Sequence, residues 1–450
     1  MSTSSSVHTE TTALASAIEE ARIVRKVAWH IMPLIMVCYL FAFFDRINVS
    51  FAKFALQTDL GLSDTAYGLG ASLFVVGYVL FEVPSNLMLY KVGARRWIAR
   101  IMVSWGIATA LMACVQVEWQ FYGLRFVIGA LEAGFAPGVL YYLTLWFPSA
   151  YRGRITSTLC LASAFAGVLG APGAGLILSQ LDGLLTLRGW HWLFLVGGIP
   201  CVFLGFLVLK VLKDRMVDAT WLTRDEQALL SRRIDEQNHS IGGQGHSLLG
   251  ALKTPGFLTL CLVYFLIQMG SYGLNFWAPH LIRASGMTNA ATIGLLTAVP
   301  YLCGAISMVV VGRLSDRSGE RRKYVMVLML LAAAGFFSAG IFAHNTAVLI
   351  AALAIMGAGV IASVPAFWAL PPKIVTGVGA AGGFALINTL GQLGGMVSPV
   401  LVGRIKDATG STTPALYAIG CLCVAGAAIV LFALPATLRA KEGTLQWRTG

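Results

Sequence analysis

The chain has 450 residues, of which 57% are hydrophobic and only 12% are charged. Soluble domains average about 25% charged residues and under about half apolar residues, so this composition excludes an ordinary water-soluble domain. The formal net charge of +12 would suggest nucleic acid as a partner in a soluble protein. In a membrane protein, however, basic residues mark the cytoplasmic loops. The composition therefore predicts an integral membrane protein that contacts the lipid bilayer and not nucleic acid.

Twelve apolar stretches are each long enough to cross a bilayer as a helix, which needs roughly 20 residues. Lipid offers no partners to backbone polar groups, so only helices and closed barrels span it, and these stretches lack the alternation of barrel strands. We therefore expect an all-α fold of twelve transmembrane helices. The expected spans are 27–48, 66–89, 97–116, 119–145, 155–180, 190–212, 256–280, 290–311, 324–343, 346–370, 380–403 and 414–437.

The spans divide into two sets of six, separated by a charged stretch. This stretch contains WLTRDEQALLSRRIDEQ, which predicts a short amphipathic helix and is too short to form a domain core of its own. The N-terminal tail lacks the apolar region of a cleaved signal peptide, so the first span is expected to direct insertion. The expected parts are a cytoplasmic tail (1–25), a six-helix bundle (26–212), a cytoplasmic linker (213–253), a second, pseudo-symmetric six-helix bundle (254–437) and a cytoplasmic tail (438–450).

The basic residues are distributed unequally between the two ends of the spans. With a cytoplasmic N-terminus, 25 of the 32 Lys and Arg residues lie on the cytoplasmic side. This asymmetry predicts that both termini and the linker are cytoplasmic. We expect a multi-pass protein of a bacterial inner membrane. Five basic residues fall on the opposite side: Lys53, Arg188, Arg283, Arg404 and Lys406.

The two halves carry a related motif after their second span. Residues 86–96 and 312–322 align with a constant offset of 226, and the second copy reads G-x-x-x-D-R-x-G-x-R-R. In the first copy Asn86 replaces the first glycine and Tyr90 replaces the aspartate. Parallel repeated halves are a recurring transporter architecture, although the motif could serve only to set topology. The candidate gating residues in these loops are Lys91, Gly93, Arg95, Gly312, Asp316, Arg317, Gly319 and Arg321.

This loop resembles the signature loop of the major facilitator superfamily. Over residues 25–440 the chain also resembles its anion:cation symporter family, and within it the bacterial tartrate, sugar-acid and aromatic-acid permeases. The resemblance implies a proton-coupled symporter that imports a small organic carboxylate, and we expect a monomer. The segments that carry it are Phe44-Asp45-Arg46-Ile47-Asn48 in the first span, 77–86 in the second, 125–148 in and after the fourth, and 272–279 in the seventh.

Four charged residues lie within the expected first and fourth spans: Asp45, Arg46, Arg125 and Glu132. A charge at mid-bilayer costs roughly 2.5–3.5 kcal/mol, so each one suggests a function. Asp45 and Arg46 point about 100° apart on a helix, so one can face a central cavity while the other meets a neighbouring helix. Arg125 and Glu132 share one face, and the four are expected to form a network. A static salt-bridge cluster is the alternative.

The resemblance assigns roles to these four residues. It implies that Asp45 and Glu132 are protonation sites, that Arg46 binds the substrate anion, and that Arg125 tunes the two acids. An arginine suits the anion because its guanidinium is always charged and offers a planar fork to a carboxylate.

Polar side chains also recur at helical spacing in three other expected spans. Such stripes can line a cavity or hydrogen-bond between helices. Glu82 lies near the cytoplasmic end of its span, so we expect a gating role for it. Aromatic residues such as Phe41, Phe43 and Phe44 could add an aromatic wall. The candidate substrate-binding residues of the stripes are Tyr78, Gln268, Tyr272, Asn275, Asn388 and Gln392.

Other function classes fit the sequence less well. H-E-x-x-H, G-x-S-x-G and Walker A motifs are absent, which disfavours an integral-membrane enzyme or an ATP-driven pump. A passive channel or facilitator would gain nothing from costly acids beside arginines. Proton antiport or efflux stays open, with only a partial antiporter-like Gly170-Ala-Pro172-Gly173. We expect no cofactor and no metal, because the cysteines and histidines show no ligand spacing.

Overall fold

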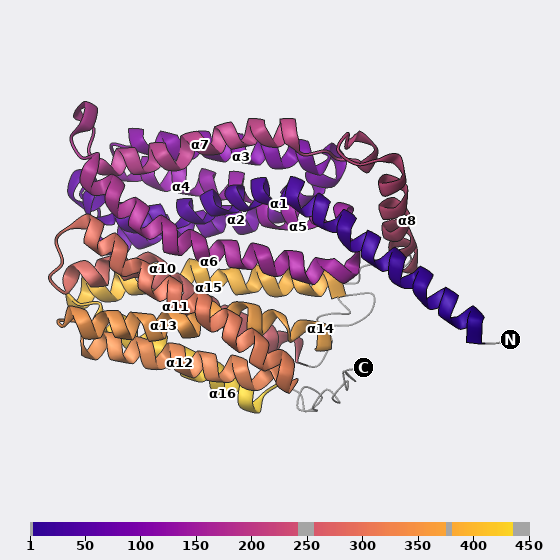
Figure 1. The fold of residues 1–450 in the computed structure, drawn as a ribbon. Helices are drawn as coiled ribbons and strands as arrows, with labels where there is room; N and C mark the ends of the chain where they lie inside the picture. Colours follow the sequence, from indigo (N-terminus) through magenta and orange to yellow (C-terminus); the bar gives the residue numbers. More distant parts are fainter. Residues whose placement is uncertain (1–2, 242–255, 375–379, 435–450) are drawn as a thin grey trace.

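The chain forms long helices that lie side by side, as expected for an all-α membrane protein (Figure 1). The structure is a computed structural model that describes residues 3–241, 256–374 and 380–434, and these ranges contain no strand. In the described part of the chain, eleven helical stretches are long and apolar enough to cross a membrane. Helix α6 (Ser149–Gln180) lies where the sequence predicts the fifth span and completes the set of twelve. The predicted fold class is confirmed.

The helices follow the predicted order in two sets. The N-terminal set is α1 (Thr3–Leu60), α2 (Asp64–Val92), α3 (Ala94–Leu111), α4 (Glu118–Glu132), α5 (Phe135–Trp146), α6 and α7 (Gly189–Val211). The C-terminal set is α10 (Phe257–Ala284), α11 (Ala290–Ser318), α12 (Arg321–Ile341), α13 (Thr346–Trp368), α14 (Pro371–Ile374), α15 (Ala380–Thr409) and α16 (Thr413–Phe432). Between the sets lies α8 (Arg224–Ile241), and 3₁₀ turns cover Met112–Cys114, Leu184–Thr186 and Met216–Asp218.

Capping residues explain where several helices begin. The side chains of Ser63, Asn289 and Asn345 accept hydrogen bonds from the backbone N–H groups of the first turns of α2, α11 and α13. These bonds satisfy donors that a helix cannot satisfy internally. Gly93 and Gly319 end α2 and α11 with φ angles of 96° and 68°. The two motif glycines thus make the sharp turns into α3 and α12.

The fourth span is two helices rather than the single helix predicted over 119–145. Helix α4 ends at Glu132, and α5 begins at Phe135 after a break at Gly134. Gly134 has φ +86°, and a Cβ there would lie 2.3 Å from Ser85 Oγ on α2. Glycine is required twice, once for the left-handed backbone and once for the close approach. The break places Glu132 at the end of a helix in the middle of the span.

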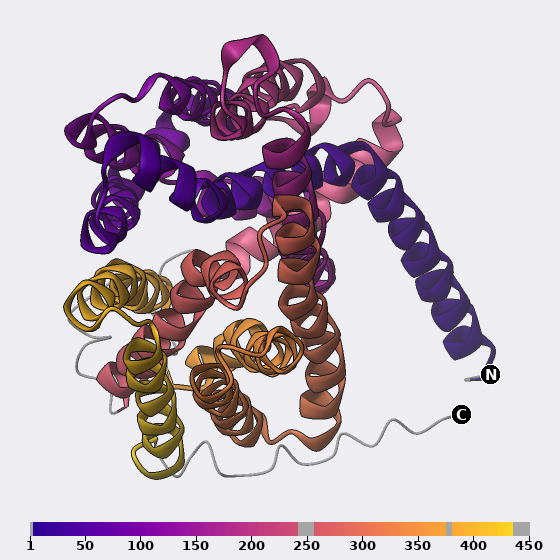
Figure 2. The same cartoon turned by 90° about the vertical axis from the view of Figure 1, so that its left-hand side faces the viewer.

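The two sets, each with six spans, form two bundles, which Figure 2 shows end-on. We call the end that carries α8 and both motif loops the α8 end, and the other the short-loop end. The bundles meet along α2 with α15 and along α6 with α11. Glycines allow these contacts: a Cβ on Gly68 would lie 2.4 Å from Pro399 O, and one on Gly175 would lie 2.4 Å from Ala290 O. Both contacts lie in the short-loop half of the helices.

Helix α1 is longer than its predicted span at both ends. It starts at Thr3 and continues to Leu60. Its early part packs against α8, which is the amphipathic helix predicted in the linker: Lys26 Nζ lies 2.7 Å from Glu226 Oε2, and the rings of His30 and Trp221 stack 4.3 Å apart. Arg22 Nη2 also lies 3.6 Å from Glu226 Oε1, so the N-terminal tail and the linker are in contact.

Candidate functional site

An ion pair between the first and fourth spans lies at the centre of the N-terminal bundle. Arg46 on α1 donates from Nε and Nη2 to Glu132 Oε1, at 2.9 and 2.6 Å. The Glu132 side chain is 1% exposed and the Arg46 side chain 26% exposed. The other carboxylate oxygen, Glu132 Oε2, is buried without a hydrogen-bond partner. Arg46 is thus the member of the pair that an incoming solute can reach.

Asp45 points away from Arg46, toward α3, as its adjacent position predicts. Its carboxylate accepts hydrogen bonds from Thr109 Oγ1 at 2.9 Å and Trp105 Nε1 at 3.2 Å, and the residue is 2% exposed. No ion pair within 4.0 Å joins it to Arg46 or Arg125 among the described residues. The predicted four-residue network is therefore one ion pair, with Asp45 held separately by α3.

Arg125 is a buried cation without a close anion. It is 1% exposed, and its Nε and Nη2 atoms have no hydrogen-bond partner. Its guanidinium lies over the ring of Phe74, 4.7 Å from the centroid. Asp45 and Glu132 are among the groups that interact with it electrostatically. Among the described residues, Arg125 thus forms no direct ion pair with either acid.

An aromatic wall surrounds Arg46. The guanidinium lies 5.3 Å from the ring centroid of Tyr78, 5.6 Å from that of Phe43 and 5.7 Å from that of Phe74. Rings at this distance attract a cation through their negative faces. They also form an apolar wall beside the charged fork.

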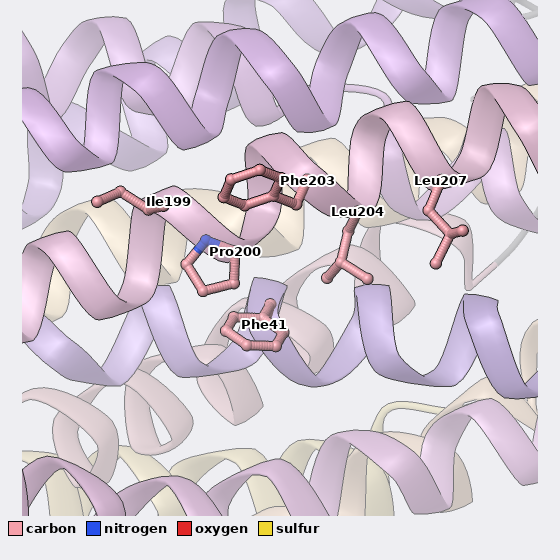
Figure 3. A pocket seen from close by; sticks show the side chains of 6 residues that line it. All are labelled: Phe41, Ile199, Pro200, Phe203, Leu204 and Leu207. Carbon is pink, nitrogen blue, oxygen red and sulfur yellow. The ribbon is translucent and has the colours of Figure 1, made fainter.

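Phe41 does not contribute to this wall. It lines a groove between α1 and α7 together with Pro200 and Phe203 (Figure 3). All six lining residues are apolar, and Phe203 is 68% exposed. We therefore interpret this groove as lipid-facing surface rather than as part of a transport path.

The C-terminal bundle contributes a second polar group. Gln392 Oε1 on α15 accepts hydrogen bonds from Tyr272 Oη at 3.0 Å and from Gln268 Nε2 at 3.2 Å, both on α10. Tyr272 also interacts electrostatically with Arg46. Three predicted stripe residues thus come together opposite Arg46. Asn275 lies apart from them, because its Oδ1 accepts from Tyr301 Oη at 2.7 Å.

Glu82 and Asn388 join the two bundles in the α8 half of the helices. Asn388 Nδ2 donates to Glu82 Oε1 at 3.2 Å. Glu82 is 8% exposed, and its Oε2 has no partner. The sequence predicts a gating role for Glu82 and a binding role for Asn388. Their contact places both at one cross-bundle position, so they can act together.

In each motif loop one arginine donates to a backbone carbonyl of the last helix of its bundle, although the two arginines are not at matching positions. In the first loop, Arg95 donates from Nε to Leu209 O at 2.7 Å and from its backbone N–H to Asp214 at 2.8 Å. In the second loop, Arg322 donates from Nε to Val430 O at 2.5 Å. Arg321, the match of Arg95 by offset, instead donates to Ala369 O at 3.5 Å. The offset of 226 from the start of α3 at Ala94 would begin α12 at residue 320, but α12 begins at Arg321. The bonding arginine is displaced by the same single residue.

The remaining motif residues are mostly exposed. Asp316 is 78% exposed and lies 3.9 Å from Arg321, and Lys91 and Arg317 are also exposed. A Cβ on Gly312 would meet no atom within 4 Å. In the first loop Tyr90, which replaces the motif aspartate, packs on Tyr141 with ring centroids 4.5 Å apart.

Sequence reasoning missed one charged residue between the bundles. Lys53, which the predicted span boundary assigns to an outer loop, is 0% exposed and lies 2.6 Å from Asp64 Oδ1. The run 51–56, which is apolar except for this lysine, is the signal that α1 continues past residue 48.

Comparison with known proteins decides the family. The sequence profile of the Major Facilitator Superfamily matches residues 35–399 and 260–449. The chain belongs to the major facilitator superfamily. A "Putative tartrate transporter" of Agrobacterium vitis is 43% identical over 94% of both chains. The "Putative metabolite transport protein NicT" of Pseudomonas putida is 41% identical over 92% of this chain and 94% of that protein.

A solved structure shows the same fold. The crystal structure of a D-xylose-proton symporter matches with a TM-score of 0.75 over 91% of this chain and 98% of that one, at 17% identity. Family and relatives together confirm the resemblance to organic-anion permeases and identify the chain as a multi-pass membrane transporter rather than an enzyme. Its substrate is a small molecule.

Proposed function

We propose that the protein is a proton-coupled symporter that imports a small organic carboxylate. The observation that carries the proposal is the Arg46–Glu132 pair. The Arg46 guanidinium is permanently charged and partly exposed, and it donates two hydrogen bonds, at 2.6 and 2.9 Å, to Oε1 of the buried Glu132 carboxylate. Glu132 and a substrate carboxylate would compete for the same donors, because a guanidinium fork binds either one in the same geometry.

This competition couples the anion to a proton. When Glu132 is ionised it occupies Arg46, and when it holds a proton it loses the charge-assisted part of that bond. The arginine is then available to a substrate carboxylate, so the anion and the proton are carried together. Asp45, held by Thr109 and Trp105, is proposed as the second proton carrier. The field of Arg125 acts on both acids.

The surroundings of Arg46 support a small, hydroxylated acid as the substrate class. Tyr272, Gln268 and Gln392 lie in the opposite bundle and offer hydroxyl and amide groups to hydroxyls or to a second carboxylate. The ring of Tyr78 lies beside Arg46 and limits the room on that side. The name of the 43%-identical relative, a putative tartrate transporter, agrees with this class. We propose Asn275 and Asn388 as further contacts in other states of the transporter.

We further propose that the α8 end faces the cytoplasm in a bacterial inner membrane and that the protein works as a monomer. The basic asymmetry of the sequence supports this orientation, since the α8 end carries most Lys and Arg residues. The motif loops and the Glu82–Asn388 contact then serve as gating elements on the cytoplasmic side.

The proposal is tested by transport in proteoliposomes of the purified protein. A panel of labelled carboxylates, including L-tartrate, a sugar acid and an aromatic acid, is offered with an acid-outside pH gradient. We expect accumulation of one class that collapses with a protonophore, and loss of accumulation in Asp45→Asn and Glu132→Gln. Accumulation that survives the protonophore but requires Na⁺ would contradict proton coupling, and accumulation of none of the carboxylates would contradict the substrate class.

A further inference from the structure

A cluster of charges joins the two bundles at the short-loop end, onto which Figure 2 looks. Asp64, at the start of α2, lies 2.6 Å from Lys53 Nζ on α1 and 2.8 Å from Lys406 Nζ on α15. Lys53 and Asp64 belong to the N-terminal bundle, and Lys406 belongs to the C-terminal bundle. The carboxylate therefore bridges a lysine of its own bundle to a lysine of the other.

Asp407 makes the reciprocal connection. Its carboxylate accepts the backbone N–H of Asp64 at 3.2 Å and that of Thr65 at 2.7 Å. An acidic group at this position satisfies two of the donors that the start of a helix leaves open and interacts favourably with the helix dipole. Asp407 of α15 thus caps the first turn of α2 in the other bundle, and Asp64 of α2 in turn forms an ion pair with Lys406 of α15.

One lysine of the cluster, Lys53, is shielded from solvent. Lys53 is 0% exposed, and its Nζ lies 3.5 Å from the ring centroid of Trp277 on α10. Trp277 belongs to the C-terminal bundle, so Lys53 contacts the opposite bundle through this ring. Nearby, the ring of His280 stacks on Phe54 of α1 at 5.0 Å. When the bundles separate at this end, Lys53 loses Trp277 and gains water.

We propose that Lys53, Asp64, Lys406 and Asp407 form the gate that closes the short-loop end of the transport path, with Asp64 as its central residue. The gate rests on the chain being a transporter and not on the proposed proton coupling. Its closed form depends on balanced charge, because breaking a buried ion pair by removing one partner leaves an uncompensated charge, whereas replacing both partners by apolar groups is often tolerated. Opening breaks the contacts of Asp64 with Lys406 and of Asp407 with the start of α2, but it also exposes the Lys53 ammonium to water.

The charge balance predicts a graded effect of substitution. Asp64→Asn removes the carboxylate that lies within 2.8 Å of both Lys53 and Lys406, so it should open the gate most. Lys406→Gln and Asp407→Asn each remove one inter-bundle contact and leave the Lys53–Asp64 pair intact, so they should open it less. The double variant Lys53→Met with Asp64→Asn removes both partners of the buried pair and should restore closure relative to Asp64→Asn alone.

The test is the distance between the bundles at the short-loop end. Spin labels are placed at Thr58 on α1 and Thr288 after α10, both exposed, in the full-length protein with its eight cysteines replaced. Pulsed dipolar spectroscopy in nanodiscs then gives the distance distribution for each variant. The matched control is Arg404→Gln, because Arg404 is an exposed cation on the same end of α15 and makes no ion pair among the described residues.

We expect a single short distance in the parent protein and in Arg404→Gln. Asp64→Asn should lower the ratio of closed to open populations by about tenfold or more, which corresponds to about 1.4 kcal/mol, and the double variant should recover most of that loss. Unchanged distributions in Asp64→Asn, Lys406→Gln and Asp407→Asn would overturn the gate. A double variant as open as Asp64→Asn would overturn the part assigned to Lys53. Because the distances need no substrate, this result is independent of the proposed proton coupling.

Discussion

Replacing Glu132 by glutamine should tighten the binding of a carboxylate to this protein rather than weaken it. In the structure Arg46 directs two N–H groups at Glu132 Oε1, at 2.9 and 2.6 Å. A substrate carboxylate must displace or neutralise this acid to use the same fork. The substitution Glu132→Gln keeps the shape of the side chain and removes the charge, so the competitor is weakened while Arg46 stays in place.

The expected gain follows from the kind of hydrogen bond that is lost. A hydrogen bond to a charged group contributes about 1.5–3 kcal/mol, against about 0.5–1.5 kcal/mol between neutral groups. The glutamine carbonyl can still accept from Arg46, so only the difference, about 1–1.5 kcal/mol, is released to the substrate. That difference corresponds to about five- to tenfold tighter binding at neutral pH.

The assay is titration calorimetry at pH 7.5 and 5.5 with the carboxylate that gives the largest thermal shift in a panel. The parent protein should bind more tightly at pH 5.5 than at pH 7.5, because the proposed coupling takes up a proton together with the anion. Glu132→Gln should bind tightly at both pH values. The control is Glu118→Gln, an exposed acid at the start of α4 that accepts a hydrogen bond from Tyr122 and not from Arg46, which should keep the pH dependence of the parent. Weaker binding in Glu132→Gln, or an unchanged pH dependence, would refute this reasoning.

Four further outcomes follow from other contacts. Arg46→Ala should abolish carboxylate binding in calorimetry and Arg46→Lys should restore little, since an ammonium lacks the planar fork; affinity in Arg46→Ala equal to the parent would contradict this. A cysteine at the exposed Ala228 of α8 should resist impermeant maleimide in intact cells, and rapid labelling would reverse the proposed orientation. Gly134→Ala should lower the free energy of unfolding by about 2–4 kcal/mol, because of left-handed backbone strain and overlap with Ser85, and so lower the melting temperature. In the control Gly123→Ala, where a Cβ meets no atom within 4 Å, the melting temperature should stay that of the parent. The hydrogen bond from Lys26 holds the pKa of Glu226 below its ordinary value. The contact between α1 and α8 is therefore fully stabilised above the unfolded pKa of about 4.3 and loses this stabilisation as the pH falls through the folded pKa. Hydrogen exchange of α8 should rise in that acidic range, and an equal rise in Glu226→Gln would contradict this.

The fold could be predicted because the bilayer restricts the possibilities. Apolar length, the motif repeat at an offset of 226 and the six-plus-six division all appear in the chain itself. The positions of Arg46 and Glu132 were also accessible, because charges in apolar runs are rare and helical periodicity fixes their direction. The adjacent residues Asp45 and Arg46 diverge as a helix requires, one toward α3 and the other toward Glu132 on α4.

What the sequence could not predict depends on contacts between helices. Hydropathy predicts one fourth span, but the close approach of Ser85 to Gly134 breaks it into two helices. Lys53 was assigned to an outer loop because a buried lysine requires a partner, and its partners Asp64 and Trp277 lie on other helices. The sequence places Phe41 and Phe43 about 200° apart on one helix, so both could not lie beside Arg46, but it does not show which of these faces α7 covers.

The central claim, that an organic carboxylate and a proton cross together, is tested most directly by recording both in one experiment. Proteoliposomes containing the protein and a trapped pH indicator receive the carboxylate from outside, with no imposed pH gradient and with the membrane potential clamped. The lumen should acidify as the labelled carboxylate enters, and vesicles containing Asp45→Asn should show neither change. Uptake of the carboxylate at the parent rate without any acidification would contradict the account.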